Sequence, residues 1–192
     1  MKIEKEHIEW VVVDRLRTML ERTSEDEFDV THAFALFSSI CGWVRQRAGA
    51  YASYSKWPSG LDDLKVPITS SAWGLRNEAA SGKAWVRLFA GADSIEIDLS
   101  KCSAWQFVVW VRNVMAHADD RRVQPIHENV CTSKPHRRLT GFRFGNDECY
   151  ANLSGEDMRR LGAKLADVFC CAFSESPSFE EDAKQGVLEQ AA

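Results

Sequence analysis

The chain has 192 residues, of which 45% are hydrophobic, so it can bury one sizeable core but is short for two independent domains. Its 24 lysines and arginines against 28 acids leave a net charge of -4, which excludes a protein that coats a polyanion with its whole surface, so any nucleic-acid contact must be local. No apolar run approaches the roughly 18–20 residues that cross a bilayer, and the first residues are too charged for a secretory signal, so we expect a cytoplasmic protein.

Two amphipathic helices are predicted at the start of the chain. Between residues 3 and 22, apolar residues recur at helical spacing with charged residues between them. A second apolar stripe runs from residue 33 to residue 44 and ends near Gly49. Only the polar stretch 23–27 separates the two patterns, and such a short connection indicates antiparallel neighbours.

The helical pattern is lost in the next segment. Residues 50–70 are rich in Ser, Tyr, Gly and Pro, which predicts a long irregular connection of the kind that is usually functional or mobile. Within it, Trp57 beside Lys56 could stack on an unpaired base or pack back on the protein. Residues 71–80 could then form a short helix.

Two β-hairpins are predicted by pairs of strand-like runs on either side of a turn. In the first pair, residues 85–89 and 95–99 flank an Ala-Gly-Ala-Asp sequence. In the second, residues 139–144 and 149–153 enclose Gly-Asn-Asp-Glu. Both hairpins are short compared with the helical segments around them.

The last two helices are predicted from their length and their first residues. Residues 100–118 contain no Gly or Pro and open with a serine suited to N-capping, although four β-branched valines leave a buried strand as the alternative. The final helix begins at Ser154, where Asp157 three residues later resembles a capping box. We therefore expect a mainly α fold with one or two small β-hairpins as insertions.

The domain organisation follows from the end of the chain. Residues 1–173 carry all of the predicted elements and form one domain. Residues 174–192 hold five acids against a single base and have few apolar residues, which is typical of a solvated or disordered tail.

One polar stripe is predicted along the central helix. At about 100° per residue, the side chains of Gln106, Asn113 and His117 fall within about 40° of one another, while most of the remaining circumference is apolar. This arrangement predicts a largely buried helix with a single groove of hydrogen-bonding groups.

Arg112 lies away from that stripe, between valines, and we expect it to be buried. A buried guanidinium needs an anionic partner or water. One interpretation is an internal ion pair to Glu4, Glu9 or another acid, in which case His117 caps its own helix end, where a cation meets the helix dipole favourably. The other is that Arg112 binds the phosphate of a ligand.

A basic segment follows the central helix. Residues 119–143 contain six bases and three acids, a local charge of +3 in an acidic protein. The bases are Arg121, Arg122, Lys134, Arg137, Arg138 and Arg143. The segment is either a solvated loop or a surface that contacts RNA.

The sequence Arg112-Asn113-Val114-Met115-Ala116-His117, at the end of an apolar helix, resembles the motif of the HEPN superfamily. That family is known for R-x4-6-H, often with a polar residue after the arginine, on a four- to five-helix bundle that commonly dimerises so that two motifs face each other. Many of its members are metal-independent endoribonucleases of toxin–antitoxin, phage-defence and RNA-processing systems. The resemblance covers the helical framework, about residues 1–173, but its specific part is six residues long.

The resemblance implies a role for each residue of the motif. His117 would be the general acid/base for attack of a ribose 2′-hydroxyl on the adjacent phosphate, Arg112 would bind that phosphate, and Asn113 would orient the imidazole or a phosphate oxygen. RNA would be held by Arg121, Arg122, Lys134, Arg137 and Arg138. It further implies a homodimer, no metal or cofactor, a 2′,3′-cyclic phosphate product and, in the toxin–antitoxin setting, an antitoxin protein as partner.

One alternative to this interpretation stays open, and one departure from the family pattern affects it. A non-catalytic HEPN-like module could use Arg112 and His117 to hold a nucleotide or to stabilise a dimer. Some HEPN toxins are inactivated by modification of a tyrosine two positions after the histidine, and because Asp119 stands there in this chain, that route is in doubt.

The cysteines and the remaining histidines offer a competing site. His127, Cys131 and His136, with Cys149, could gather a zinc ion, although their spacings match no common zinc finger. The six cysteines are scattered without any C-x-x-C pair, so we expect them to be reduced and mostly buried.

Overall fold

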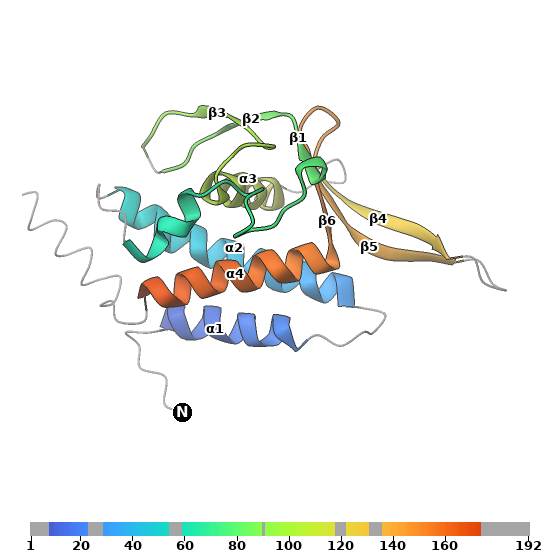
Figure 1. Cartoon of the computed structure of the whole chain (residues 1–192), viewed down its shortest axis with the longest axis horizontal. Coiled ribbons are helices and arrows are strands. Elements are labelled where there is room, and N and C mark those ends of the chain that lie inside the picture. Colours follow the sequence, from blue (N-terminus) through green and yellow to red (C-terminus); the bar gives the residue numbers. More distant parts are fainter. Residues whose placement is uncertain are drawn as a thin grey trace, which may run out of the picture.

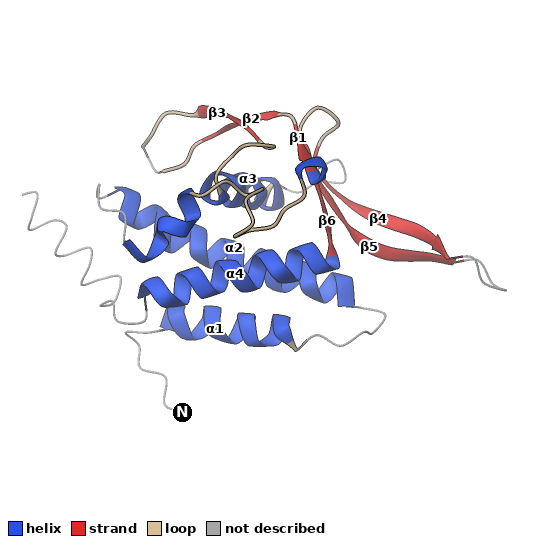
Figure 2. Cartoon of the chain, in the orientation of Figure 1, coloured by secondary structure: helices blue, strands red, loops and turns tan. Residues whose placement is uncertain are grey.

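The computed structural model of the protein describes residues 8–22, 29–53, 59–89, 91–117, 122–130 and 136–173. It is a mixed α/β protein, so the mainly α fold expected from the sequence is wrong (Figure 1 and Figure 2). Its helices are α1 (Ile8–Glu21), α2 (Asp29–Ser53), α3 (Ala104–Ala116), α4 (Gly155–Phe173) and the short 3-10 helices η2 (Ser59–Lys65) and η3 (Asn77–Ala79). Its strands are β1 (Ala80–Ser81), β2 (Lys83–Val86), β3 (Ile95–Asp98), β4 (Val123–Val130), β5 (His136–Gly145) and β6 (Tyr150–Ser154).

The helices pack around α4, whose neighbours are α1, α2 and η2 (Figure 1). Side chains link α1 to α4, because the Trp10 indole N–H donates to the Cys170 carbonyl at 3.1 Å and Arg17 pairs with Asp167 at 2.5 Å. On its other side, α2 packs against α3. None of the described helices combines the length and the apolar character that crossing a membrane requires.

The start of α4 confirms the capping box predicted from the sequence. The Ser154 backbone N–H and hydroxyl donate to the Asp157 carboxylate at 3.1 and 2.7 Å, and the Asp157 N–H donates back to the Ser154 hydroxyl at 3.0 Å. This local chemistry fixes the first turn of the helix without help from the rest of the fold.

A four-stranded antiparallel sheet with the order β1-β6-β5-β4 stands beside the helices (Figure 2). The predicted hairpin around residues 145–148 is confirmed as the β5–β6 pair, in which Gly145 lies opposite Tyr150. Phe34 of α2 packs against Phe142 of β5 with ring centroids 4.4 Å apart and the rings tilted by 34°, which fixes the sheet to the helical layer.

The strand β4 was missed, since its segment was predicted to be a loop. It pairs with β5 along its whole length, and the resulting ribbon extends away from the helices (Figure 1). Its sequence, VQPIHENV, lacks the regular alternation of apolar residues because it is an edge strand with much of its surface in solvent. Pro125 within it also argues against a strand, and only an edge tolerates such a proline.

The predicted hairpin around residues 90–93 is confirmed as the β2–β3 pair, with Val86 opposite Ile95. It lies over α3 (Figure 1). The helix prediction for residues 100–118 is also confirmed, which excludes the alternative of a buried strand, but the N-cap is Ser103. Ser100, predicted to be the cap, instead donates its hydroxyl to Asp98 at 2.6 Å.

Candidate functional site

The HEPN-like motif occupies the last turns of α3, where the helix reaches the surface. Val111 and Val114 are buried, but Arg112 and His117 are exposed and Asn113 is half-buried. The prediction that Arg112 is buried is therefore wrong. Among the described residues, no acid forms an ion pair with Arg112, while the side chains of Glu4 and Glu9 lie outside the described part of the chain.

A second arginine, Arg45 of α2, lies within reach of the charge of Arg112. Burial, and after it the charge of the Arg112 guanidinium, lowers the pKa of Arg45. The Arg45 guanidinium also lies over the Trp105 ring, 5.3 Å from its centroid. Neither arginine has an ion pair with an acid in the described part of the chain. Two cations that feel each other's charge and have no carboxylate partner favour the binding of an anion. We call Arg45 and Arg112 together the arginine site.

His117 terminates α3 as its C-cap residue. Its backbone N–H donates to the Asn113 carbonyl at 3.1 Å, and its φ and ψ of -111° and 25° depart from the helix. Because it follows Arg112 by five residues, its side chain leaves α3 about 140° around the axis from that of the arginine. On ideal helix geometry, the Cβ atoms of Arg112 and His117 therefore lie on different sides of α3.

The polar stripe predicted along α3 is not one continuous groove. Gln106 lies about 16 Å from His117 along the helix axis, and it belongs to the capping box at the opposite end. Its side-chain oxygen accepts from the Ser103 N–H at 2.9 Å, and its own N–H donates to the Ser103 hydroxyl at 3.3 Å. Of the three stripe residues, only Asn113 and His117 lie together.

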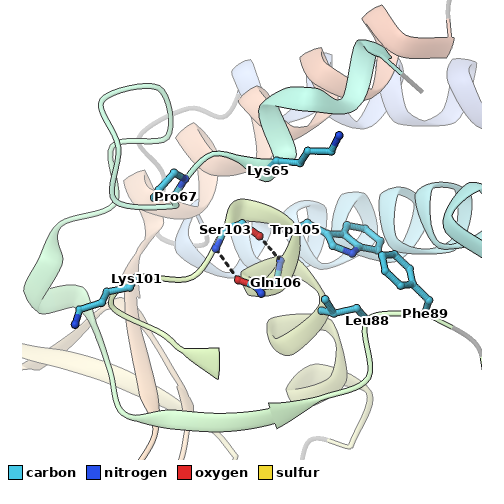
Figure 3. Close-up of a pocket in the computed structure, with 8 residues that line it drawn as sticks. All are labelled: Lys65, Pro67, Leu88, Phe89, Lys101, Ser103, Trp105 and Gln106. Carbon is cyan, nitrogen blue, oxygen red and sulfur yellow. Dashed lines mark hydrogen bonds between the residues drawn. The ribbon is translucent and has the colours of Figure 1, made fainter. Parts of the chain in front are cut away.

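A pocket of about 450 Å³ opens at the start of α3 (Figure 3). We call it the α3 pocket, and sequence reasoning missed it because three separate stretches of chain build it. Its lining residues are Lys65, Pro67, Leu88, Phe89, Lys101, Ser103, Trp105 and Gln106. The Phe89 and Trp105 rings stack with centroids 6.0 Å apart, and Trp105 is also the ring under Arg45. The pocket and the arginine site are thus neighbours.

A second pocket of about 450 Å³ lies beside the other half of α3. It is lined by Lys83, Ala84, Trp110, Val114, Arg122, Gly145, Asn146 and Cys149. Since His117 follows Trp110 by seven residues and Val114 by three, it extends from the same face of α3. This pocket therefore opens toward the side of the helix on which His117 lies.

Of the bases assigned to RNA binding, the described ones, Arg122, Arg137 and Arg138, lie on or next to the β4–β5 ribbon, so the loop predicted for their segment is wrong. Arg122 lines the second pocket, and Arg138 is exposed on β5 opposite Glu128 of β4. Arg137 lies opposite Asn129 in the ribbon, but its side chain, like all of Arg121 and Lys134, is outside the described residues. Arg143 packs over the Tyr150 ring at 4.1 Å.

The described residues do not support the zinc site considered from the sequence. They contain no group of three or more potential metal ligands. His127 lies opposite Leu139 on the ribbon, whereas Cys149 adjoins the far end of β5, about 20 Å along the strand. Cys131 and the side chain of His136 lie outside the described residues.

Most of the cysteines are buried, as expected from the sequence. Cys41, Cys102, Cys149 and Cys170 are free and buried, and Cys171 is free and exposed. Burial raises the pKa of Cys102 and of Cys170 to about 12, so both thiols are neutral and unreactive at physiological pH. These buried cysteines are therefore not candidates for a catalytic nucleophile.

Comparison with known proteins identifies no protein family, no curated protein and no solved structure that matches the chain. The function must therefore be argued from the motif and from the geometry around it.

Proposed function

We propose that the protein is a metal-independent endoribonuclease of the HEPN type, acting in a toxin–antitoxin or phage-defence setting. The observation that carries the proposal is the exposed end of α3, where Arg112 and His117 of the motif both reach solvent. The charge of Arg112 reaches Arg45, and no carboxylate of the described residues pairs with either arginine. An RNA phosphate supplies the missing negative charge.

The reaction needs an acid/base and a group that binds the phosphate. His117 accepts the proton of a ribose 2′-hydroxyl while the 2′-oxygen forms a bond to phosphorus and the bond from phosphorus to the 5′-oxygen breaks. The leaving 5′-oxygen takes a proton from water, His117 returns its proton to solvent, and the other product ends in a 2′,3′-cyclic phosphate. Arg112 and Arg45 stabilise the negative charge that builds on the phosphate oxygens, and Asn113 orients the imidazole.

Two copies of the chain complete one site in this proposal. The side chains of Arg112 and His117 leave α3 about 140° apart, so one copy alone does not direct both at the same phosphate. In a two-fold dimer, Arg112 of one subunit and His117 of the partner subunit can face a single phosphate, and symmetry provides two such sites.

A second candidate function is a module that binds RNA or a nucleotide without cutting it. The position of His117 favours this candidate, because a C-cap histidine at the end of a helix dipole already has a structural role. The arginine site would then bind a phosphate of the RNA or nucleotide, and no bond would be cleaved.

The distinguishing experiment is cleavage of a mixed RNA substrate in EDTA by the wild type, by His117→Ala and by His32→Ala. His32 is an exposed histidine on α2 and serves as the matched control, and circular dichroism checks that all three proteins are folded. We expect the wild type and the control to cut RNA, and His117→Ala to lose roughly 100-fold or more of the rate.

The products should carry 2′,3′-cyclic phosphate ends, which mass spectrometry identifies. A folded wild type that binds RNA but leaves it intact would overturn the ribonuclease in favour of the binding module. If His117→Ala cuts RNA as fast as the wild type, the motif histidine takes no part in the reaction.

A further inference from the structure

The α3 pocket has the walls and the size of a site for one planar ring. Its volume of about 450 Å³ falls in the range of roughly 300–1,000 Å³ that is common for small-ligand sites. Phe89 and Trp105 lie side by side along one wall with their rings 19° from parallel, and Leu88 is next to them (Figure 3). A flat, uncharged ring would pack favourably on the half-buried Phe89 ring of this wall, whereas Trp105, only 4% exposed, mainly supports that ring from behind the surface.

The pocket is joined to the arginine site through Trp105. This side chain lines the pocket and also lies under the Arg45 guanidinium, which in turn feels the charge of Arg112. An anion site beside an apolar pocket with an aromatic wall matches one class of ligand in particular, a nucleotide, in which a phosphate is linked through a sugar to a base. An uncharged apolar ligand would leave the two arginines unused.

Gln106 supplies a polar group with a fixed orientation. Its side-chain oxygen accepts from the Ser103 N–H, and this hydrogen bond holds the amide in place at the edge of the pocket (Figure 3). The amide Nε2 donates to none of the described residues, so it remains available to an acceptor on a ligand. The capping box already occupies the start of the helix, which makes a base edge a better partner for this pocket than a second phosphate.

We propose that the α3 pocket binds an unpaired nucleobase of the RNA and gives the protein a preference among bases. The base packs on the Phe89 ring supported by Trp105, Gln106 Nε2 donates to a carbonyl oxygen or ring nitrogen on its edge, and the linked phosphate contacts Arg45 and Arg112. This inference rests on the proposed function in that the base and the phosphate belong to the same RNA.

The test measures binding and leaves cleavage aside. In a His117→Ala background, the affinities of fluorescent hexamers of A, of C and of U are compared at one fixed salt concentration. We expect one hexamer to bind several-fold more tightly than the others. Phe89→Ala should weaken that hexamer by about tenfold, the typical effect of losing one stacked base.

Gln106→Glu is the sharper variant, because glutamate also serves in a capping box and the helix start is kept. It replaces the donating nitrogen with an acceptor, so the preference among the hexamers should shrink or change. Arg15→Ala is the control for loss of charge, since this exposed residue of α1 is not part of the pocket lining, and it should leave the order of the hexamers unchanged.

Equal affinities for the three hexamers, unchanged by Phe89→Ala and Gln106→Glu, would overturn the inference even if the wild type cuts RNA. Base-dependent binding that responds to both variants would support it even if the wild type cuts nothing, and in that case only the ribonuclease proposal fails.

Discussion

At the scale of single residues, the position of the Arg45 guanidinium depends on a glycine one turn further along α2. A Cβ added at Gly49 would collide with Nη1 of Arg45, so the glycine leaves the space that the guanidinium occupies. Gly42, on the same helix, has no atom within 4 Å of the place where its Cβ would lie. A side chain at Gly49 would therefore displace the Arg45 guanidinium, whereas a side chain at Gly42 would not.

Replacing either glycine by alanine should stabilise α2 by about 0.5–1 kcal/mol, because alanine loses less backbone entropy in a helix. Only Gly49→Ala should also displace Arg45 and weaken RNA binding several-fold. Thermal unfolding measures the first effect and fluorescence anisotropy with a short RNA measures the second. If Gly49→Ala binds RNA as tightly as Gly42→Ala does, the Arg45 position does not matter for binding.

The motif residues show which features of the candidate site could be predicted from the sequence. The polar residues at the end of an apolar helix predicted a site at its last turns, and that site stays a prediction; the structure shows Arg112 and His117 exposed there. The burial predicted for Arg112 failed because its neighbours in sequence, Val111 and Val114, face other directions around the helix. Arg45 could not be predicted, because it reaches the site only through the packing of α2 on α3.

At the scale of elements, the features that could be predicted are those with local causes. The start of α4 was found because Ser154 and Asp157 cap it within one turn. The β5–β6 hairpin was found from its turn residues. The strand β4 was missed because a half-exposed edge strand lacks apolar alternation, and only its pairing with β5 defines it.

The start of α3 provides a prediction at this scale. Ser103→Ala removes the hydroxyl that accepts from the Gln106 N–H, and it should lower the free energy of unfolding by about 1 kcal/mol. Gln106→Glu should leave it nearly unchanged, since a glutamate carboxylate can accept from the Ser103 N–H in the same way. Urea unfolding, monitored by tryptophan fluorescence, measures the free energy of unfolding of both variants and of the wild type. A loss of equal size in both variants would contradict the capping box as the source of this stability.

At the scale of the whole molecule, the sheet and the helices surround α3 on several sides and leave only parts of it open. The β2–β3 hairpin covers it on one side and α2 on another (Figure 1). A pocket lies beside each half of the helix. Neither pocket could be predicted from the sequence, because each joins residues that are far apart in the chain. The same arrangement directs Arg112 and His117 to different sides, which is why the proposed reaction needs two copies.

The most direct test of this account mixes two variants that should each be inactive, Arg112→Ala and His117→Ala, after partial unfolding and refolding together. In a random mixture, half of the dimers contain one chain of each variant, and one of their two sites has both an intact arginine and an intact histidine. The account predicts recovery of about one quarter of the wild-type rate of RNA cleavage in EDTA. A mixture that stays inactive, beside a wild type that cuts RNA and survives the same refolding, would contradict a site shared between two copies.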